Sequence, residues 1–398
     1  MNRSTANPST HLLPYGMLAV LWLVGWSLRV PILTAPPLAT RIADSFGLGE
    51  AAEGALTMLP VVSVAFGAIP AAWLIARFGL RAAIVAGLLV MTAASVARGQ
   101  VPSAALLFLA STVMGLGVAV FQTALPATTR VWTPTHVALG SAVYLNGMML
   151  GELSGAGLTL PVVLPMAGGD WRFALVLWSI PILLIALLVA LMRLPKDQSD
   201  AGLPGLCQEA SLPRWNDLRI WQYGLLLGSS VVAFFVVNAY SGSILQTRGE
   251  YEAAEEFHFA YNAMPLMASF AVLMMPRWIG SSAPIAISAL FAALGLAGFA
   301  FLDGWASWAS GMVVGFAATV ELILLVSLPP TIAKGVAVTR LSAGMTLIGF
   351  SIAFLLTLLG GWLADGIGWI ELALAPSLIF MIAALGALGR AAQFPNYE

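Results

Sequence analysis

The sequence consists mainly of long apolar runs separated by short polar or charged breaks. A helix needs about 20 mostly apolar residues to cross the hydrocarbon core of a bilayer. Cut at glycine, proline and charge clusters, the runs cover residues 14–39, 54–76, 80–98, 103–128, 136–164, 172–193, 220–246, 256–276, 279–301, 305–333, 341–364 and 370–391. This pattern predicts an all-α polytopic membrane protein with about twelve transmembrane helices.

One longer polar stretch interrupts the apolar pattern near the middle of the chain. It runs from Pro195 to Asp217 and combines charged residues with Pro and Gly. We interpret it as a cytoplasmic linker between two six-helix bundles. The predicted organisation is a cytoplasmic N-terminus, a first bundle, the linker, a second bundle and a cytoplasmic C-terminus, at residues 1–13, 14–193, 194–219, 220–391 and 392–398. The N-terminal segment has no signal-peptide pattern, so the first run is expected to remain as a helix.

Composition supports a lipid-facing surface and argues against several other classes. Hydrophobic residues make up 60% of the chain and charged residues 9%, whereas a soluble domain carries about 25% charged residues. The single Cys207 cannot form an internal disulfide, and the three histidines are far apart in the sequence. The sequence has no GxxxxGK[ST] motif, nucleophile elbow or Cys/His pair. We therefore expect no enzyme activity, no cofactor, no metal site and no nucleic-acid partner.

The distribution of Lys and Arg predicts how the chain lies in the membrane. With the N-terminus in the cytoplasm, most basic residues fall in cytoplasmic loops and tails. The outside loops then hold only Arg41, Arg98, Arg172 and Arg248. These outside loops are acidic and include Glu50 and Glu53. We expect a multi-pass protein of the bacterial inner membrane with both termini cytoplasmic.

The two halves of the sequence resemble each other at an offset of about two hundred residues. Pro126–Arg130 ends the fourth run and Pro330–Lys334 ends the tenth, while Arg77–Gly79 and Arg277–Gly280 close the second and eighth. Parallel repeats of this kind place a substrate site between the halves, near the bilayer midplane. The sequence therefore predicts a central site built from both bundles.

Several short motifs carry a resemblance to a known family. They are Ser27-Leu28-Arg29-Val30-Pro31, Gly115-Leu116-Gly117, Leu125-Pro126-Ala127, Asp170-Trp171-Arg172, Leu341-Ser342-Ala343-Gly344-Met345 and the stretch Gly361–Trp369. In these the chain resembles the cyanate and nitroimidazole transporter (CynX/NimT-like) group of the major facilitator superfamily. The resemblance implies two six-helix bundles and secondary transport.

Two superfamily motifs are altered in this chain. In the loop between the second and third runs the resemblance implies a gating role for Arg77, Gly79 and Arg81, but Ala76 replaces the usual Asp. In the fifth run Glu152 replaces the Pro of the antiporter signature. The sequence therefore gives little support for a drug antiporter.

Arg29 carries the sharpest functional signal. It lies about 3 Å from the centre of the first run, where an Arg costs about 2.5–3.5 kcal/mol to insert. A guanidinium binds carboxylate-like anions in a planar fork, so we predict that Arg29 anchors an anionic or strongly polar solute. The alternative is a buried ion pair that fixes helix packing. Trp26, on the same helix face, is predicted to line the site, with simple packing as its alternative.

Glu152 and Glu321 are the other two charges near the middle of a run. We predict that one of them binds a proton and couples it to solute movement. The alternative is that a Glu only neutralises Arg29.

Polar residues at similar depth complete the predicted substrate-binding set: Gln122, Tyr144, Asn146, Asn238 and Tyr240. Each can hydrogen-bond a small polar ligand, and the alternative for each is a hydrogen bond between helices. His258 lies beside several Glu residues and is predicted to be a wetted loop residue.

These observations predict a secondary active transporter of a small polar, anionic solute, such as a cyanate-like ion or small organic anion. We expect alternating access, proton-coupled uptake, and a monomer whose partners are the solute, protons and the lipid bilayer. One alternative is proton-coupled efflux of small organic or nitroaromatic compounds. An alternative from a different class is a membrane receptor or sensor that kept the fold without transport.

Overall fold

The computed structural model describes residues 15–133, 136–192, 215–332 and 336–388, and over these ranges the chain is helical with no strand. The N-terminal half contains α1 (Tyr15–Leu33), η1 (Pro36–Leu38), α2 (Ala39–Phe46), α3 (Glu50–Gln100), α4 (Ala104–Trp132), α5 (Val137–Gly157), η2 (Thr159–Val163), α6 (Leu164–Met166) and α7 (Trp171–Leu191). The C-terminal half contains α9 (Leu218–Thr247), η4 (Tyr251–Ala253), α10 (Ala254–Met274), η5 (Pro276–Trp278), α11 (Ser282–Phe301), α12 (Gly304–Val326), α13 (Pro329–Ile332), α14 (Val336–Ile367), η6 (Ile370–Leu374) and α15 (Ala375–Leu388). The all-α prediction is confirmed.

Each predicted apolar run corresponds to helix in this structure. Among the described residues, nine helices are long and apolar enough to cross a membrane, or ten if the pair Val143–Gly157 and Thr159–Met166, bent by 53°, is one span. The long α3 supplies two of these spans because Gly79 adopts φ 81° and ψ 165° and breaks the helix there. A backbone with positive φ favours glycine, so the residue type explains the position of the break.

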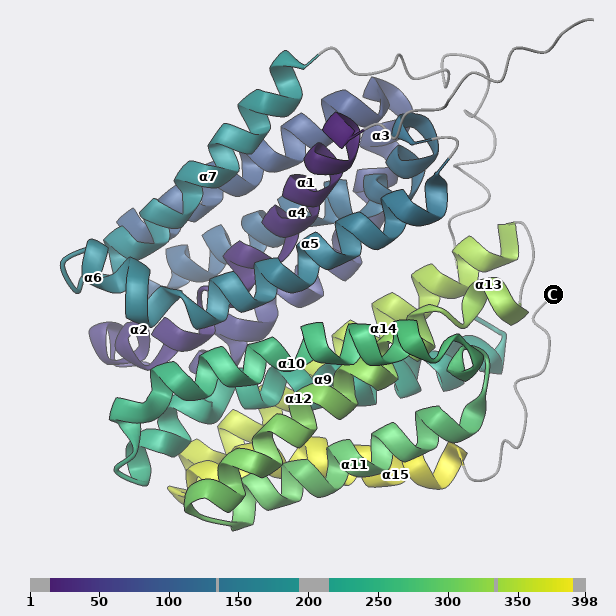
Figure 1. Cartoon of the computed structure of the whole chain (residues 1–398). Helices are drawn as coiled ribbons and strands as arrows, with labels where there is room; N and C mark the ends of the chain where they lie inside the picture. The colour runs from purple at the N-terminus through teal and green to yellow at the C-terminus, as the bar shows by residue number, and fades with distance from the viewer. Residues whose placement is uncertain (1–14, 134–135, 193–214, 333–335, 389–398) are drawn as a thin grey trace, which may run out of the picture.

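The helices of the two halves form two groups that lie side by side (Figure 1). In Figure 1, α1 and α7 belong to one group, and α9, α11 and α14 belong to the other. The predicted domain limits remain a prediction, because the linker region 193–214 lies outside the described residues. We call the end of the molecule where α1 ends and α3 begins the distal end.

Candidate functional site

Close packing of α1 on α5 brings the two central charges together. A side chain at Gly147 would meet the carbonyl oxygen of Trp22, and one at Gly151 would meet that of Trp26. Small residues at such positions let helix backbones approach in a membrane. Arg29 and Glu152 each follow this contact along their own helix and therefore face one another.

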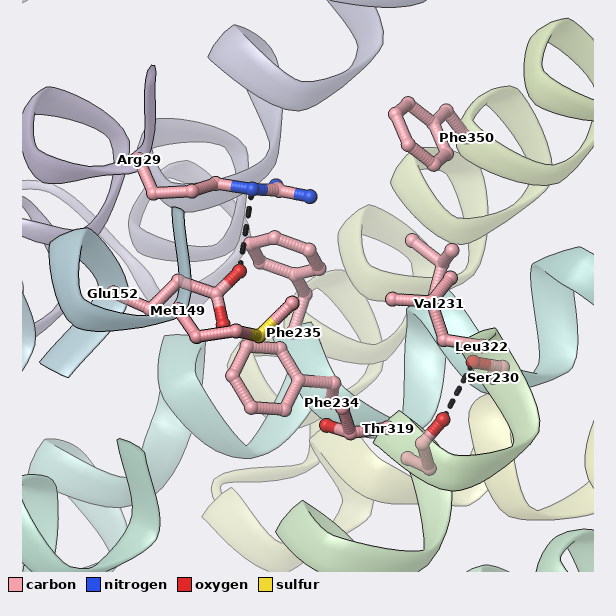
Figure 2. Close-up of a pocket in the computed structure, with 11 residues that line it drawn as sticks. Arg29, Met149, Glu152, Ser230, Val231, Phe234, Phe235, Thr319, Leu322 and Phe350 are labelled. Atoms are coloured by element: carbon pink, nitrogen blue, oxygen red, sulfur yellow. Dashed lines mark hydrogen bonds and ion pairs between the residues drawn. The ribbon is translucent and has the colours of Figure 1, made fainter. Parts of the chain in front are cut away.

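The Arg29–Glu152 ion pair lies in the interior of the protein. Arg29 Nε is 3.2 Å from Glu152 Oε1, and the two side chains are 9% and 6% exposed. The Nε atom is not aligned for a hydrogen bond, so the contact is ionic in character. Within the described ranges, the two terminal nitrogens of Arg29 have no hydrogen-bond partner, and they extend beyond Glu152 (Figure 2). The guanidinium fork is thus available to a ligand.

A small cavity begins at this ion pair and is lined by helices of both halves. Its lining residues are Arg29, Met149, Glu152, Ser230, Val231, Phe234, Phe235, Ala318, Thr319, Leu322 and Phe350. The charged pair comes from α1 and α5, whereas the aromatic residues come from α9 and α14 (Figure 2). Ser230 donates a hydrogen bond of 2.8 Å to the Ala318 carbonyl and so ties α9 to α12 at the wall. The cavity therefore has one ionic side and one largely apolar side.

Glu321 is fully buried next to this wall but does not line the cavity. Ser229 donates a hydrogen bond of 2.9 Å to its Oε1, and its Oε2 has no partner in the described part of the chain. Glu321 therefore contacts α9 at the residue next to the wall residue Ser230 but does not itself reach the cavity.

The remaining predicted residues of the N-terminal half lie away from the cavity lining. Trp26 Nε1 donates to Ser154 Oγ at 3.1 Å. Asn146 Oδ1 accepts a hydrogen bond of 3.0 Å from Trp22 Nε1. Both contacts join α1 to α5, as the helix-packing alternative for these residues expects. Gln122 and Tyr144 are partly buried and are absent from the lining.

Two predicted residues of α9 make contacts between helices. Asn238 Oδ1 accepts a hydrogen bond of 3.0 Å from Asn262 Nδ2, so this pair joins α9 to α10. The Tyr240 hydroxyl donates to the Thr357 carbonyl at 2.8 Å and joins α9 to α14. Neither side chain lines the cavity.

The loop inside α3 is stabilised by contacts within the N-terminal half. Arg81 Nε donates to the Val189 carbonyl at 3.3 Å, near the end of α7, where helix carbonyls lack internal partners. The Arg77 guanidinium lies 5.9 Å from the centre of the Phe78 ring. Together with the break at Gly79, these contacts fix the turn between the two spans of α3.

Two sequence predictions outside this site are wrong. Arg98 was expected in an outside loop but lies within α3 and is 1% exposed. Its Nη1 donates to the Pro31 carbonyl at 2.9 Å, whereas its Nε and Nη2 have no partner in the described residues. His258 was expected to be wetted but is 1% exposed, because it faces the protein interior from the first turns of α10.

Sequence reasoning missed the aromatic side of the cavity. Phe234, Phe235 and Phe350 occur in apolar runs, where an aromatic residue that faces lipid has the same sequence pattern as one that lines a cavity. Their role depends on helix rotation, which composition does not encode.

The helical halves and the ionic cavity between them define a polytopic membrane transporter. The chain belongs to the Major Facilitator Superfamily, whose family profile matches residues 17–351. It is 26% identical to the 2-nitroimidazole transporter of Escherichia coli (strain K12) over 316 residues, 77% of each chain. It is 25% identical to the cyanate transport protein CynX of the same organism over 169 residues, 42% of each chain. These relatives agree with the group predicted from the sequence motifs.

Solved structures show the same fold at lower sequence identity. The D-xylose-proton symporter matches with a TM-score of 0.74 and 16% identity, over 93% of this chain and 96% of that one. A mutant of the nucleoside transporter NupG matches with a TM-score of 0.75 and 12% identity, over 95% of this chain and 99% of that one. The family match identifies the chain as a transporter.

Proposed function

We propose that this transporter carries a small polar anion across the membrane by alternating access and couples its uptake to protons. The observation that carries the proposal is the free guanidinium fork of Arg29 at a cavity lined by both halves. A buried guanidinium that faces a cavity favours a planar anionic group, because it offers parallel N–H donors and a compensating charge. The limited size of the cavity supports a small solute.

The proton follows from the charge balance of the cavity. Arg29 and Glu152 are neutral as a pair, so a bound anion adds an uncompensated negative charge to a poorly solvated space. Protonation of Glu152 removes that excess and also releases Arg29 from its partner. The anion and the proton therefore favour each other's binding, which is the thermodynamic requirement for symport. Glu321, behind the wall, is a second candidate for the coupling proton.

Charge replacement at Arg29 tests the proposal. Proteoliposomes are loaded with buffer and given an inward proton gradient, and uptake of labelled cyanate and small carboxylates is measured. Arg29→Gln should abolish uptake while inserting normally, and Arg29→Lys should retain a fraction of it. Arg41→Gln, at an exposed position, is the control and should transport as wild type. Normal uptake by Arg29→Gln at low solute concentration would refute the anion anchor.

A second candidate function is efflux of small heteroaromatic compounds. The aromatic residues of the cavity support it, because planar rings stack on such side chains. The relative named as a 2-nitroimidazole transporter supports it as well. With an imposed pH gradient, net accumulation of 2-nitroimidazole against the proton flow would favour efflux, whereas accumulation with the flow would favour uptake.

We also propose a monomer in the bacterial inner membrane with both termini cytoplasmic. The excess of Lys and Arg in the predicted cytoplasmic loops supports this orientation. Labelling of the natural Cys207 with a membrane-impermeant thiol reagent in intact cells and in lysed cells tests it. Cys207 should react only after lysis.

A further inference from the structure

A buried carboxylate joins the two halves at the distal end. Glu53, in the first turn of α3, is 3% exposed. Its Oε2 accepts a hydrogen bond of 2.8 Å from Ser243 Oγ on α9, and its Oε1 lies 3.4 Å from Thr40 Oγ1 on α2. The Ser243 contact crosses from the N-terminal half to the C-terminal half. It can therefore exist only while the halves meet at this end.

A second carboxylate crosses the same interface in the opposite direction. Asp365 of α14 accepts hydrogen bonds from the backbone N–H groups of Glu50 at 2.7 Å and Ala51 at 3.0 Å. These groups belong to the first turn of α3, whose N-cap Gly49 has no side chain to satisfy them. An anion at a helix N-terminus is also favoured by the helix dipole. The C-terminal half thus supplies the cap for a helix of the other half.

Glycines allow the close approach that these contacts need. A Cβ at Gly54 would clash with the hydroxyl of Tyr240, and a Cβ at Gly361 would clash with Ala51. The interface is therefore tightly packed around Glu53, and water has little room to solvate its carboxylate.

The groups around Glu53 do not compensate a negative charge. No Lys, Arg or His nitrogen lies within 4.0 Å of its carboxylate in the described residues. The titratable groups around it are Glu50 on its own helix, which acts on Glu53 directly, and Tyr240 on α9; Asp365 on α14 acts on both of these. None of these is a cation. An ionised carboxylate buried beside hydroxyls and other acids is costly, whereas a neutral carboxyl in the same place is not.

We propose that Glu53 is a proton-binding residue of a gate at the distal end: it holds a proton while the gate is closed and loses it after the gate opens. The proton on Glu53 stabilises the closed contact with Ser243, and Asp365 supplies a capping contact across the same interface. When the halves separate, Glu53 enters water and ionises at neutral pH. The inference rests on the alternating access of the proposed function, but it does not depend on the identity of the solute.

Distance measurements between spin labels test the proposal without solute. The Cys207→Ser chain contains no other cysteine, so cysteines introduced at the exposed Asp44 and Gln246 report on the distal end of each half. Electron–electron distances are recorded in nanodiscs from pH 5 to pH 9. If closure requires one proton, the ratio of closed to open molecules falls by up to about tenfold for each unit by which the pH rises. We expect that loss in the parent chain and a closed, pH-independent distribution in Glu53→Gln.

Two further variants keep the test decisive. Glu50→Gln, one turn away on the same helix, removes the acid that acts on Glu53; it should retain the pH response, with the midpoint moved to lower pH. Ser243→Ala should lower the closed population at every pH and still respond to pH, which covers the case that Glu53→Gln does not fold. A parent chain whose distances ignore pH, a Glu53→Gln chain that titrates like the parent, or a Glu50→Gln chain that loses the response overturns the proposal. Loss of transport in an Arg29 variant leaves these distances unaffected, so the two proposals fail separately.

Discussion

Replacing Glu152 by Gln should make anion binding at Arg29 independent of pH. At the observed 3.2 Å separation, Coulomb's law with an effective dielectric constant of about 20 gives an attraction of about 5 kcal/mol between the two charges. An anion that binds the guanidinium must compete with this attraction while Glu152 is ionised. Gln keeps the size of the side chain and removes both the competing charge and the titratable proton.

The expected magnitudes follow from the same contact. In the parent chain, affinity for an anion should fall by up to about tenfold per pH unit above the pH at which Glu152 loses its proton. The variant should bind the anion with the same affinity at pH 6 and at pH 8. At pH 8 its affinity should exceed that of the parent. The unliganded variant should be less stable, because a broken buried ion pair typically costs about 3–5 kcal/mol. A bound anion should restore part of that stability.

Thermal-shift titration and calorimetry with a panel of small anions that includes cyanate can measure both effects. Glu321→Gln is the matched control, since it removes a buried carboxylate that does not line the cavity. It should keep the pH dependence of binding. If Glu152→Gln binds anions with the parent's pH dependence, the competition between Glu152 and the solute for Arg29 is refuted.

Three further predictions concern other parts of the fold. Gly361→Ala should open the distal contact even at low pH, because the added methyl group meets Ala51, and the distance between the spin labels should increase. Gly366→Ala, on the same helix but in open space, should behave as the parent. Arg98→Met should leave the melting temperature unchanged or raise it, because it removes two buried nitrogens that have no partner among the residues described. The Pro31 carbonyl keeps a hydrogen bond from Thr34 in this variant. A clear decrease in melting temperature would contradict this account. Glu321→Gln should keep the stimulation of uptake by a proton gradient, because Glu152 supplies the coupling proton. Loss of that stimulation would assign the proton to Glu321 instead.

The fold and the central charge could be predicted because membrane insertion constrains the sequence strongly. Long apolar runs identify the helices, and the cost of placing Arg29 in hydrocarbon requires it to face the interior. The sequence leaves the ion pair between Arg29 and Glu152 as one alternative to a free, ligand-binding Arg29. The pair depends on the rotation of α5 about its axis, which the Gly147 and Gly151 contacts with α1 determine.

The distal contact could not be predicted because its pattern is that of an exposed helix start. Glu50 and Glu53 lie in the first turn of α3, where acidic residues favour any helix. Only the tertiary structure places Glu53 against Ser243, 190 residues further along the chain. Contacts of this kind depend on the relative position of the two halves, and neither half's sequence contains that information alone.

The different surroundings of the two carboxylates suggest an order of events in the transport cycle. Glu152 has a cation at 3.2 Å, so it can remain ionised while the cavity is empty. Glu53 has hydroxyl partners and no such cation in the described structure, so closure of the distal end requires its proton even without solute. Closure of the distal end by the empty carrier should therefore slow as the pH on that side rises, although the central pair stays neutral throughout. Binding of the anion adds the second proton requirement, at Glu152, and makes the loaded step depend more steeply on pH than the empty one.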